Sequence, residues 1–146
     1  MDKNIRRNFI ALGAALLLGA AVAPMALADG KSPIAKAVLQ VSDNDPVKWN
    51  LALNNARNVQ ADLGAENVDL EIVAYGPGLN MLTADSPVAK RVAEALQAGV
   101  KIVACENTMK GRKLVYADML PNIGYAEAGV VELIRKQQQG YAYIRP

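Results

Sequence analysis

The sequence predicts a single α/β domain with three layers: a mainly parallel sheet of about five strands and helices on both of its faces. Three observations lead to this fold class. Short apolar runs alternate along the chain with longer segments of helical character, and turn residues close most of the runs. The runs are almost continuously apolar, as expected for parallel strands that helices bury on both sides.

The first half of the domain contains a strand, a long helix and a second strand. Residues 34–41 form an apolar run that ends at a polar turn. Asp45 is a suitable N-cap and Pro46 a suitable first residue for the helix that follows, and Gly64 is placed to end it. Residues 68–75 form the second strand, which Gly-Pro-Gly closes.

The second half continues the alternation. Its expected elements, in order, are a helix that starts at Ser86-Pro87 and stops at Gly99, a strand over 100–105, a short helical piece over 109–120, a short strand over 123–126, a helix over 128–138 and an edge strand over 141–144. We find no internal repeat and no second domain. Sites in such folds gather beyond the carboxyl ends of the strands.

The N-terminus is predicted to be a signal peptide over residues 1–28, followed by the α/β domain over 29–146. Three basic residues precede an apolar core at residues 9–22, and Ala26-Leu27-Ala28 gives the small-residue pattern of a cleavage site. The core is shorter than the ~20 residues that a membrane-spanning helix needs. An uncleaved anchor is the alternative.

The expected location is therefore the periplasm or the exterior, with no stable membrane association after cleavage. Arg6 and Arg7 resemble a twin-arginine signal, although Ile5 stands where that signal usually has Ser or Thr. The Sec and twin-arginine routes both remain open.

The charge of the mature chain gives no sign of a nucleic-acid partner. The whole chain has 16 basic and 14 acidic residues, and cleavage after Ala28 removes three of the former and one of the latter, which leaves equal numbers. A domain without net charge has no electrostatic preference for nucleic acid or for an anionic membrane.

Cys105 is the single cysteine, and the chain has no histidine. One thiol cannot form an intramolecular disulfide, although an exported protein meets an oxidising space. Without histidine there is no Ser-His or Cys-His catalysis, and a zinc site is not expected. We expect no metal and no cofactor.

Three polar loops should meet at the carboxyl edge of the sheet: Ser42 to Asp45, Gly76 to Gly78, and Cys105 to Thr108. Cys105 is the candidate catalytic residue, and the candidate pocket residues are Asp43, Gly76, Gly78, Asn107 and Thr108. Structural roles are also open to them, since Asp43 suits a turn and the two glycines suit a tight turn.

Cys105 follows a buried strand and precedes a polar turn and a helix start. N–H groups at such a turn stabilise a thiolate, and Lys110 and Arg112 could add positive charge, whereas Glu106 would oppose them. Free cysteines are also commonly small buried hydrophobes. Position alone leaves a reactive thiol and an inert one equally open.

Four segments resemble the DsrE/DsrF-like family, specifically its exported members of unassigned role. They are VSDNDPVKWNLALNNARN (41–58), IVAYGPGL (72–79), VKIVACENTM (100–109) and AGVVELIRKQQQGYAYIRP (128–146). The resemblance covers nearly all of residues 34–146. It implies a three-layer α/β fold and oligomers, often trimers or hexamers.

The resemblance also implies a chemistry. Sulfur-relay members of the family hold sulfur as a persulfide on a cysteine in the loop after a central strand, and Cys105 matches that position. This chain departs from them in its predicted export and in having Glu106-Asn107-Thr108 where they have a helix of small residues.

Two hypotheses follow. The first is a periplasmic sulfur carrier or relay component that works with a donor or acceptor protein; we expect a carrier rather than an enzyme, because no general base is visible. The second is a non-catalytic oligomeric module that binds a small ligand, with Cys105 as core packing. A redox enzyme would need a second thiol from a partner.

Overall fold

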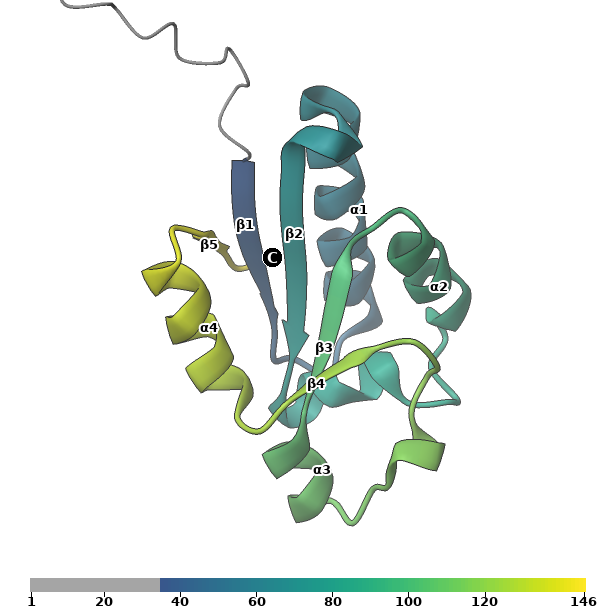
Figure 1. Ribbon diagram of the computed structural model, residues 1–146. Coiled ribbons are helices and arrows are strands. Elements are labelled where there is room, and N and C mark those ends of the chain that lie inside the picture. The colour runs from purple at the N-terminus through teal and green to yellow at the C-terminus, as the bar shows by residue number, and fades with distance from the viewer. Residues whose placement is uncertain (1–34) are drawn as a thin grey trace, which may run out of the picture. The chain divides into compact units, whose positions relative to one another are not determined.

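The computed structural model describes residues 35–146, and the predicted signal peptide lies outside the described residues. Five strands form one sheet in the order β4-β3-β2-β1-β5, and every neighbouring pair is parallel. The expected fold class is confirmed, with a sheet that is parallel throughout (Figure 1).

The elements alternate along the chain as the sequence predicts. The strands are β1 (Ala35–Val41), β2 (Val68–Ala74), β3 (Lys101–Cys105), β4 (Gly124–Ala126) and β5 (Ala142–Ile144). The α-helices are α1 (Pro46–Leu63), α2 (Ala89–Gln97), α3 (Glu106–Gly111) and α4 (Gly129–Gln138). The part of the chain that the structure describes also has three 3₁₀ helices, η1 (Ala65–Asn67), η2 (Gly76–Leu82) and η3 (Tyr116–Asp118).

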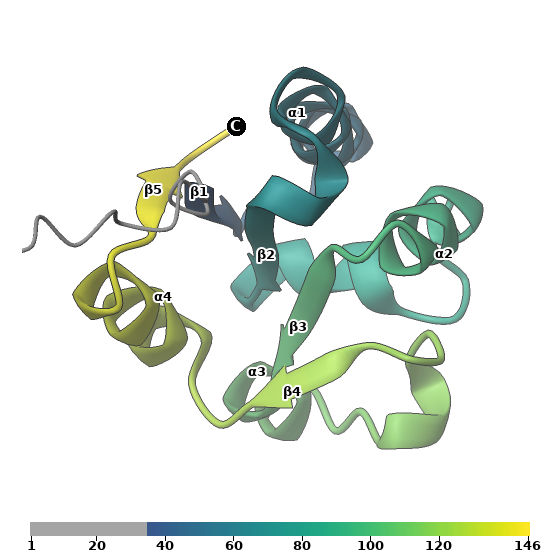
Figure 2. The ribbon, with the colours of Figure 1, turned by 45° about the horizontal axis from the view of Figure 1, so that its top comes forward.

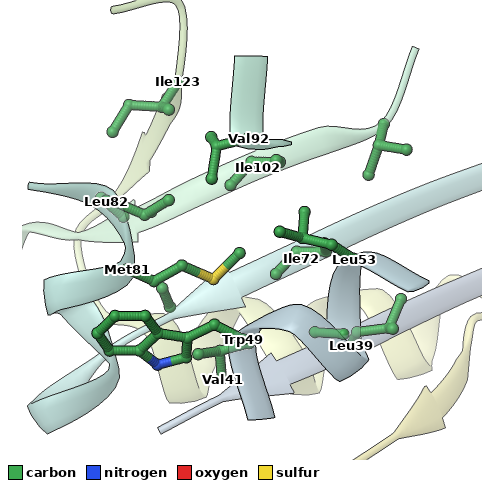
Figure 3. Close-up of a cluster of buried hydrophobic side chains, with 14 of the residues drawn as sticks. Leu39, Val41, Trp49, Leu53, Ile72, Met81, Leu82, Val92, Ile102 and Ile123 are labelled. Atoms are coloured by element: carbon green, nitrogen blue, oxygen red, sulfur yellow. The ribbon is translucent and has the colours of Figure 1, made fainter. Parts of the chain in front are cut away.

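Helices cover both faces of the sheet, which gives three layers. Figure 2 shows α1 and α2 on one side of the strands and α4 on the other. The main core lies under α1 and α2 and includes the labelled side chains of Figure 3, among them Leu39, Ile72 and Ile102 from the strands and Trp49 and Val92 from the helices. A smaller cluster of Val38, Val73, Leu133 and Tyr141 lies under α4.

The predicted ends of α1 are confirmed. The Asp45 carboxylate accepts a hydrogen bond from the Val47 N–H at 2.8 Å, as an N-cap should. Gly64 follows the helix with φ +86°, a conformation that glycine adopts without strain.

The helical piece predicted over 109–120 is wrong in its placement. Helix α3 begins at Glu106, directly after Cys105, and ends at Gly111; Lys113 then takes a left-handed conformation with φ +58°. Asn107 and Thr108 are weak helix formers in a helix interior, but the first turn tolerates them and favours an acidic residue such as Glu106. The polar turn expected after Cys105 is therefore itself the first turn of the helix.

Within residues 35–146, no helix combines the length and the apolar character that crossing a membrane requires.

Candidate functional site at the carboxyl edge of the sheet

Hydrogen bonds join the three loops that follow β1, β2 and β3. The Gly78 N–H donates to the Ser42 carbonyl at 3.1 Å, which links the first loop to the second. The Gly76 N–H donates to the Thr108 hydroxyl at 2.9 Å, which links the second loop to the third. Because all strands are parallel, their carboxyl ends share one edge, and the structure brings the predicted loops together there.

The two glycines of the second loop are needed for different structural reasons. A Cβ atom at Gly78 would lie 2.4 Å from the Val41 carbonyl oxygen, and only glycine permits this approach of two backbones. Gly76 has φ +55°, a conformation that glycine adopts without strain, and its N–H donates to the Thr108 hydroxyl. Gly78 thus lets the second loop pack directly on the end of β1, while Gly76 takes part in the contact with the third loop.

Cys105 is the last residue of β3 and is only 5% exposed. Its Sγ lies 3.9 Å from the Glu127 carbonyl oxygen, to which the protonated thiol donates. Burial alone would raise the pKa of this thiol, but hydrogen bonds from the Thr108 hydroxyl and from the N–H groups of Gly129, Thr108 and Asn107 outweigh it. The pKa of Cys105 is consequently lowered, as a reactive thiol requires.

The Thr108 hydroxyl is oriented by its second contact. Its oxygen accepts the Gly76 N–H, so its single hydrogen is free to point at the Cys105 sulfur. The Gly-Pro-Gly loop therefore acts on the thiol through Thr108.

Gly129, the first residue of α4, was not anticipated from the sequence. A Cβ atom at this position would lie 2.9 Å from the Cβ of Tyr75. The absence of a side chain lets the first turn of α4 lie against Tyr75 and present its N–H to Cys105. A glycine inside the first turn of a helix, where it costs stability, was the available signal.

The charged neighbours of Cys105 behave differently from the expectation. Arg112 donates to the Asn80 side chain, and the main groups that lower the pKa of Cys105 are N–H groups and a hydroxyl, not Lys110 or Arg112. The Glu106 carboxylate accepts a hydrogen bond from the Tyr116 hydroxyl. Uncharged donors thus replace the cations as the source of thiolate stabilisation.

Asp43 and Asn107 have mainly structural contacts. The Asp43 carboxylate pairs with Lys48 at 2.7 Å and lies 4.0 Å from Arg145, and the Lys48 hydrogen bond lowers the pKa of Asp43. The Asp43 carbonyl accepts from the Trp49 indole at 2.8 Å. Asn107 contributes its backbone N–H, which donates to the Glu127 backbone carbonyl at 3.0 Å and also faces the Cys105 sulfur.

The model of the DsrE/DsrF-like family matches residues 34–146. The chain belongs to this family. The DsrE/DsrF-like family is related to sulfur-relay proteins, which agrees with the resemblance found in the sequence.

Two solved structures that are similar to this DsrE-like domain are described as proteins of unknown function. MTH1491 from Methanobacterium thermoautotrophicum is 36% identical, with a TM-score of 0.73 over 77% of this chain and 99% of that chain. BT1422 from Bacteroides thetaiotaomicron is 15% identical, with a TM-score of 0.61 over 76% of this chain and 94% of its own, a likeness of fold alone. Curated proteins gave no match.

The DsrE-like domain shows no metal centre in its described part: residues 35–146 contain no group of three or more His, Cys, Asp or Glu side chains that could hold a metal ion. The donors at Cys105 are N–H and O–H groups, which bind anions rather than cations.

A second polar cluster lies under α4, and sequence reasoning missed it. Glu71 on β2 is 2% exposed, and its Oε2 pairs with the Lys136 Nζ at 2.6 Å. Lys136 also lies 3.6 Å from Glu132. Nearby, the Tyr141 hydroxyl donates to Asp69 at 2.6 Å, and Lys101 pairs with the same carboxylate at 2.9 Å.

Proposed function

We propose that this protein carries sulfane sulfur as a persulfide on Cys105. The proposal rests on a buried cysteine at the carboxyl edge of the sheet, whose pKa is lowered by hydrogen bonds from the Thr108 hydroxyl and from the N–H groups of Gly129, Thr108 and Asn107. Such donors stabilise a thiolate, the form of cysteine that reacts with sulfur compounds. Membership of a family related to sulfur-relay proteins supports the same role.

The transfer needs no general base and no net oxidant. The Cys105 thiolate attacks the outer sulfur of a donor persulfide, R–S–SH; a new S–S bond forms, the old one breaks, and RS⁻ leaves with the electron pair. Cys105 then holds the sulfur as S–SH, and an acceptor thiolate removes it by the reverse exchange. The protein is in this sense a carrier, with the donor and acceptor supplied by partners.

The direct experiment is intact-mass measurement after incubation with inorganic polysulfide. Wild type should gain about 32 Da, and a thiol reductant should remove the adduct, as it removes reversible caps on cysteine. Cys105→Ser should gain nothing. Removal by reductant separates a persulfide from the sulfinic acid, which has nearly the same added mass and is irreversible under these conditions.

The same variant separates the carrier from a ligand-binding module with Cys105 as packing. A serine hydroxyl at position 105 would meet the donors that surround the sulfur and the Glu127 carbonyl, so Cys105→Ser should cost less than ~1 kcal/mol of unfolding free energy. No uptake by wild type, together with a loss of 1–3 kcal/mol in the variant, would favour the packing role and contradict the carrier.

We further infer that the chain is exported and that cleavage precedes Asp29. The basic, apolar and small-residue segments of residues 1–28 support this, and the family match begins only at residue 34. N-terminal sequencing of the protein from its native compartment should read from Asp29; a start at Met1 or Asp2 would contradict cleavage.

We also propose that the protein is a homo-oligomer, a trimer or a hexamer. Val130 and Ile134 on α4 are 54% and 49% exposed, and Tyr143 on the edge strand β5 is 43% exposed. Exposed apolar side chains on a helix and on an edge strand are commonly covered by another subunit. Light scattering should give a multiple of the subunit mass at micromolar concentration, and a single subunit mass would contradict the proposal.

A further inference from the structure

Tyr116 contacts the residue next to Cys105 although it lies in η3, beyond helix α3. Its side chain is 60% exposed, yet it is fixed by two contacts. The ring meets Tyr125 of β4 edge to face, with centroids 4.6 Å apart and planes at 80°. The hydroxyl donates a hydrogen bond to the Glu106 carboxylate.

The direction of the Glu106 carboxylate matters because Glu106 follows Cys105 directly. A carboxylate that approached the sulfur would disfavour the thiolate by like-charge repulsion. The effects of Glu106 fall on the tyrosines instead: its hydrogen bond raises the pKa of Tyr116, and its charge, after burial, helps to raise the pKa of Tyr125. The main groups that act on Cys105 are the four donors described above.

We propose that Tyr116 is a positioning residue that holds the Glu106 carboxylate against the Tyr116–Tyr125 pair and away from the Cys105 sulfur. Three titratable residues border Cys105: Glu106 follows it directly in α3, Glu127 contacts the sulfur through its backbone carbonyl, and Tyr75 packs on Gly129. The inference gives the tyrosine pair a role in the proposed sulfur carriage. Its test measures the thiol itself and does not depend on sulfur uptake.

The experiment compares four proteins: wild type, Tyr116→Phe, Glu106→Gln and the double variant. Tyr116→Phe keeps the ring on Tyr125 but releases the carboxylate, so the pKa of Cys105 should rise and iodoacetamide alkylation at pH 7 should slow by about threefold. Glu106→Gln alone should react at the wild-type rate. The double variant should also react at that rate, because the charge that Tyr116 controls is gone.

Rescue by Glu106→Gln distinguishes positioning from a structural role, since a disturbed loop would stay disturbed after removal of the charge. Glu127→Gln is the control for the loss of a carboxylate: Glu127 contacts the sulfur through its backbone only and is exposed, so this variant should not rescue Tyr116→Phe. An unchanged rate in Tyr116→Phe, or a slow rate that persists in the double variant, would overturn the proposal. Polysulfide loading of wild type, measured separately, reports on the proposed function.

Discussion

Helix α4 contacts two buried acidic groups, one near each of its ends. Their pKa values are shifted in opposite directions. Gly129, at its start, gives an N–H to Cys105, whose pKa is lowered although the residue is 5% exposed. Lys136, in its last turn, pairs with Glu71, whose pKa is raised by burial even though the lysine opposes this. Burial is similar in the two places, so burial alone does not decide which form is stable.

The number of donors that reach the acidic atoms explains the difference. Four donors from two helices, α3 and α4, converge on one sulfur atom. Glu71 has one strong partner on Oε2, and its Oε1 has no hydrogen-bond partner within residues 35–146. A buried polar atom without a partner costs ~1–3 kcal/mol, which penalises the charged carboxylate. The surroundings of Cys105 therefore favour the anionic form of its acidic group, whereas the surroundings of Glu71 favour the neutral form.

The two regions therefore contribute opposite pH dependences to stability. The folded protein binds fewer protons at Cys105 than the unfolded chain, so this contribution is full above the unfolded pKa and is lost as pH falls through the folded pKa. Glu71 binds more protons in the folded protein, so its contribution declines as pH rises from the unfolded pKa through the raised folded one.

The largest expected effect is on the Glu71 side of the comparison. Lys136→Met should lower the free energy of unfolding by about 3–5 kcal/mol at pH 7, because it leaves a buried carboxylate without its partner. The loss should be smaller at acidic pH, where Glu71 is protonated. Urea unfolding at both pH values measures this.

Lys101→Met is the matched control, because it breaks the Lys101–Asp69 pair, in which the lysine side chain is 55% exposed. It should cost less than ~1 kcal/mol. Equal losses in the two variants would show that Glu71 does not depend on Lys136.

A smaller effect is expected from Gly129→Ala, which affects the Cys105 side. The new Cβ would meet Tyr75 at 2.9 Å, so the first turn of α4 must move away, and overpacking of this kind costs ~1–3 kcal/mol. The pKa of Cys105 should rise with the loss of the Gly129 N–H. Thermal unfolding and the pH dependence of alkylation give the two readouts.

Gly111→Ala is the control for the added methyl group, because a Cβ there would meet nothing within 4 Å. It should stabilise slightly, by ~0.5–1 kcal/mol, and leave Cys105 unchanged. If Gly129→Ala also stabilised the protein and left the pKa of Cys105 unchanged, this result would contradict the contact between α4 and the thiol.

The fold and the meeting of the three loops were predictable because both follow from local pattern. The strands are largely apolar runs, and the turns carry Asp45 and Gly64 at positions where capping chemistry requires such residues. A parallel sheet then places the loops at one edge. The same local pattern was enough to predict that Cys105 lies at the end of β3.

The donors to Cys105 were only partly predictable, because they come from segments that are distant in sequence. Asn107 and Thr108 follow the cysteine, but Gly129 reaches it through the return of α4 across the sheet, and Gly76 acts through Thr108. Lys110 and Arg112 were reasonable candidates by sequence distance alone. Only the fold shows that neutral groups take their place and that Glu106 turns toward Tyr116.

The most direct test of the central claim, that hydrogen bonds make the buried Cys105 thiolate stable, is its ionisation measured by the pH dependence of iodoacetamide alkylation. Wild-type Cys105 should ionise below the value of about 8.5 for a free cysteine. Thr108→Val, which removes the hydroxyl between Gly76 and the sulfur, should raise the pKa, and Thr108→Ser should keep the wild-type value. A wild-type thiol with a pKa at or above about 8.5, or a thiol pKa that Thr108→Val leaves unchanged, would contradict the account.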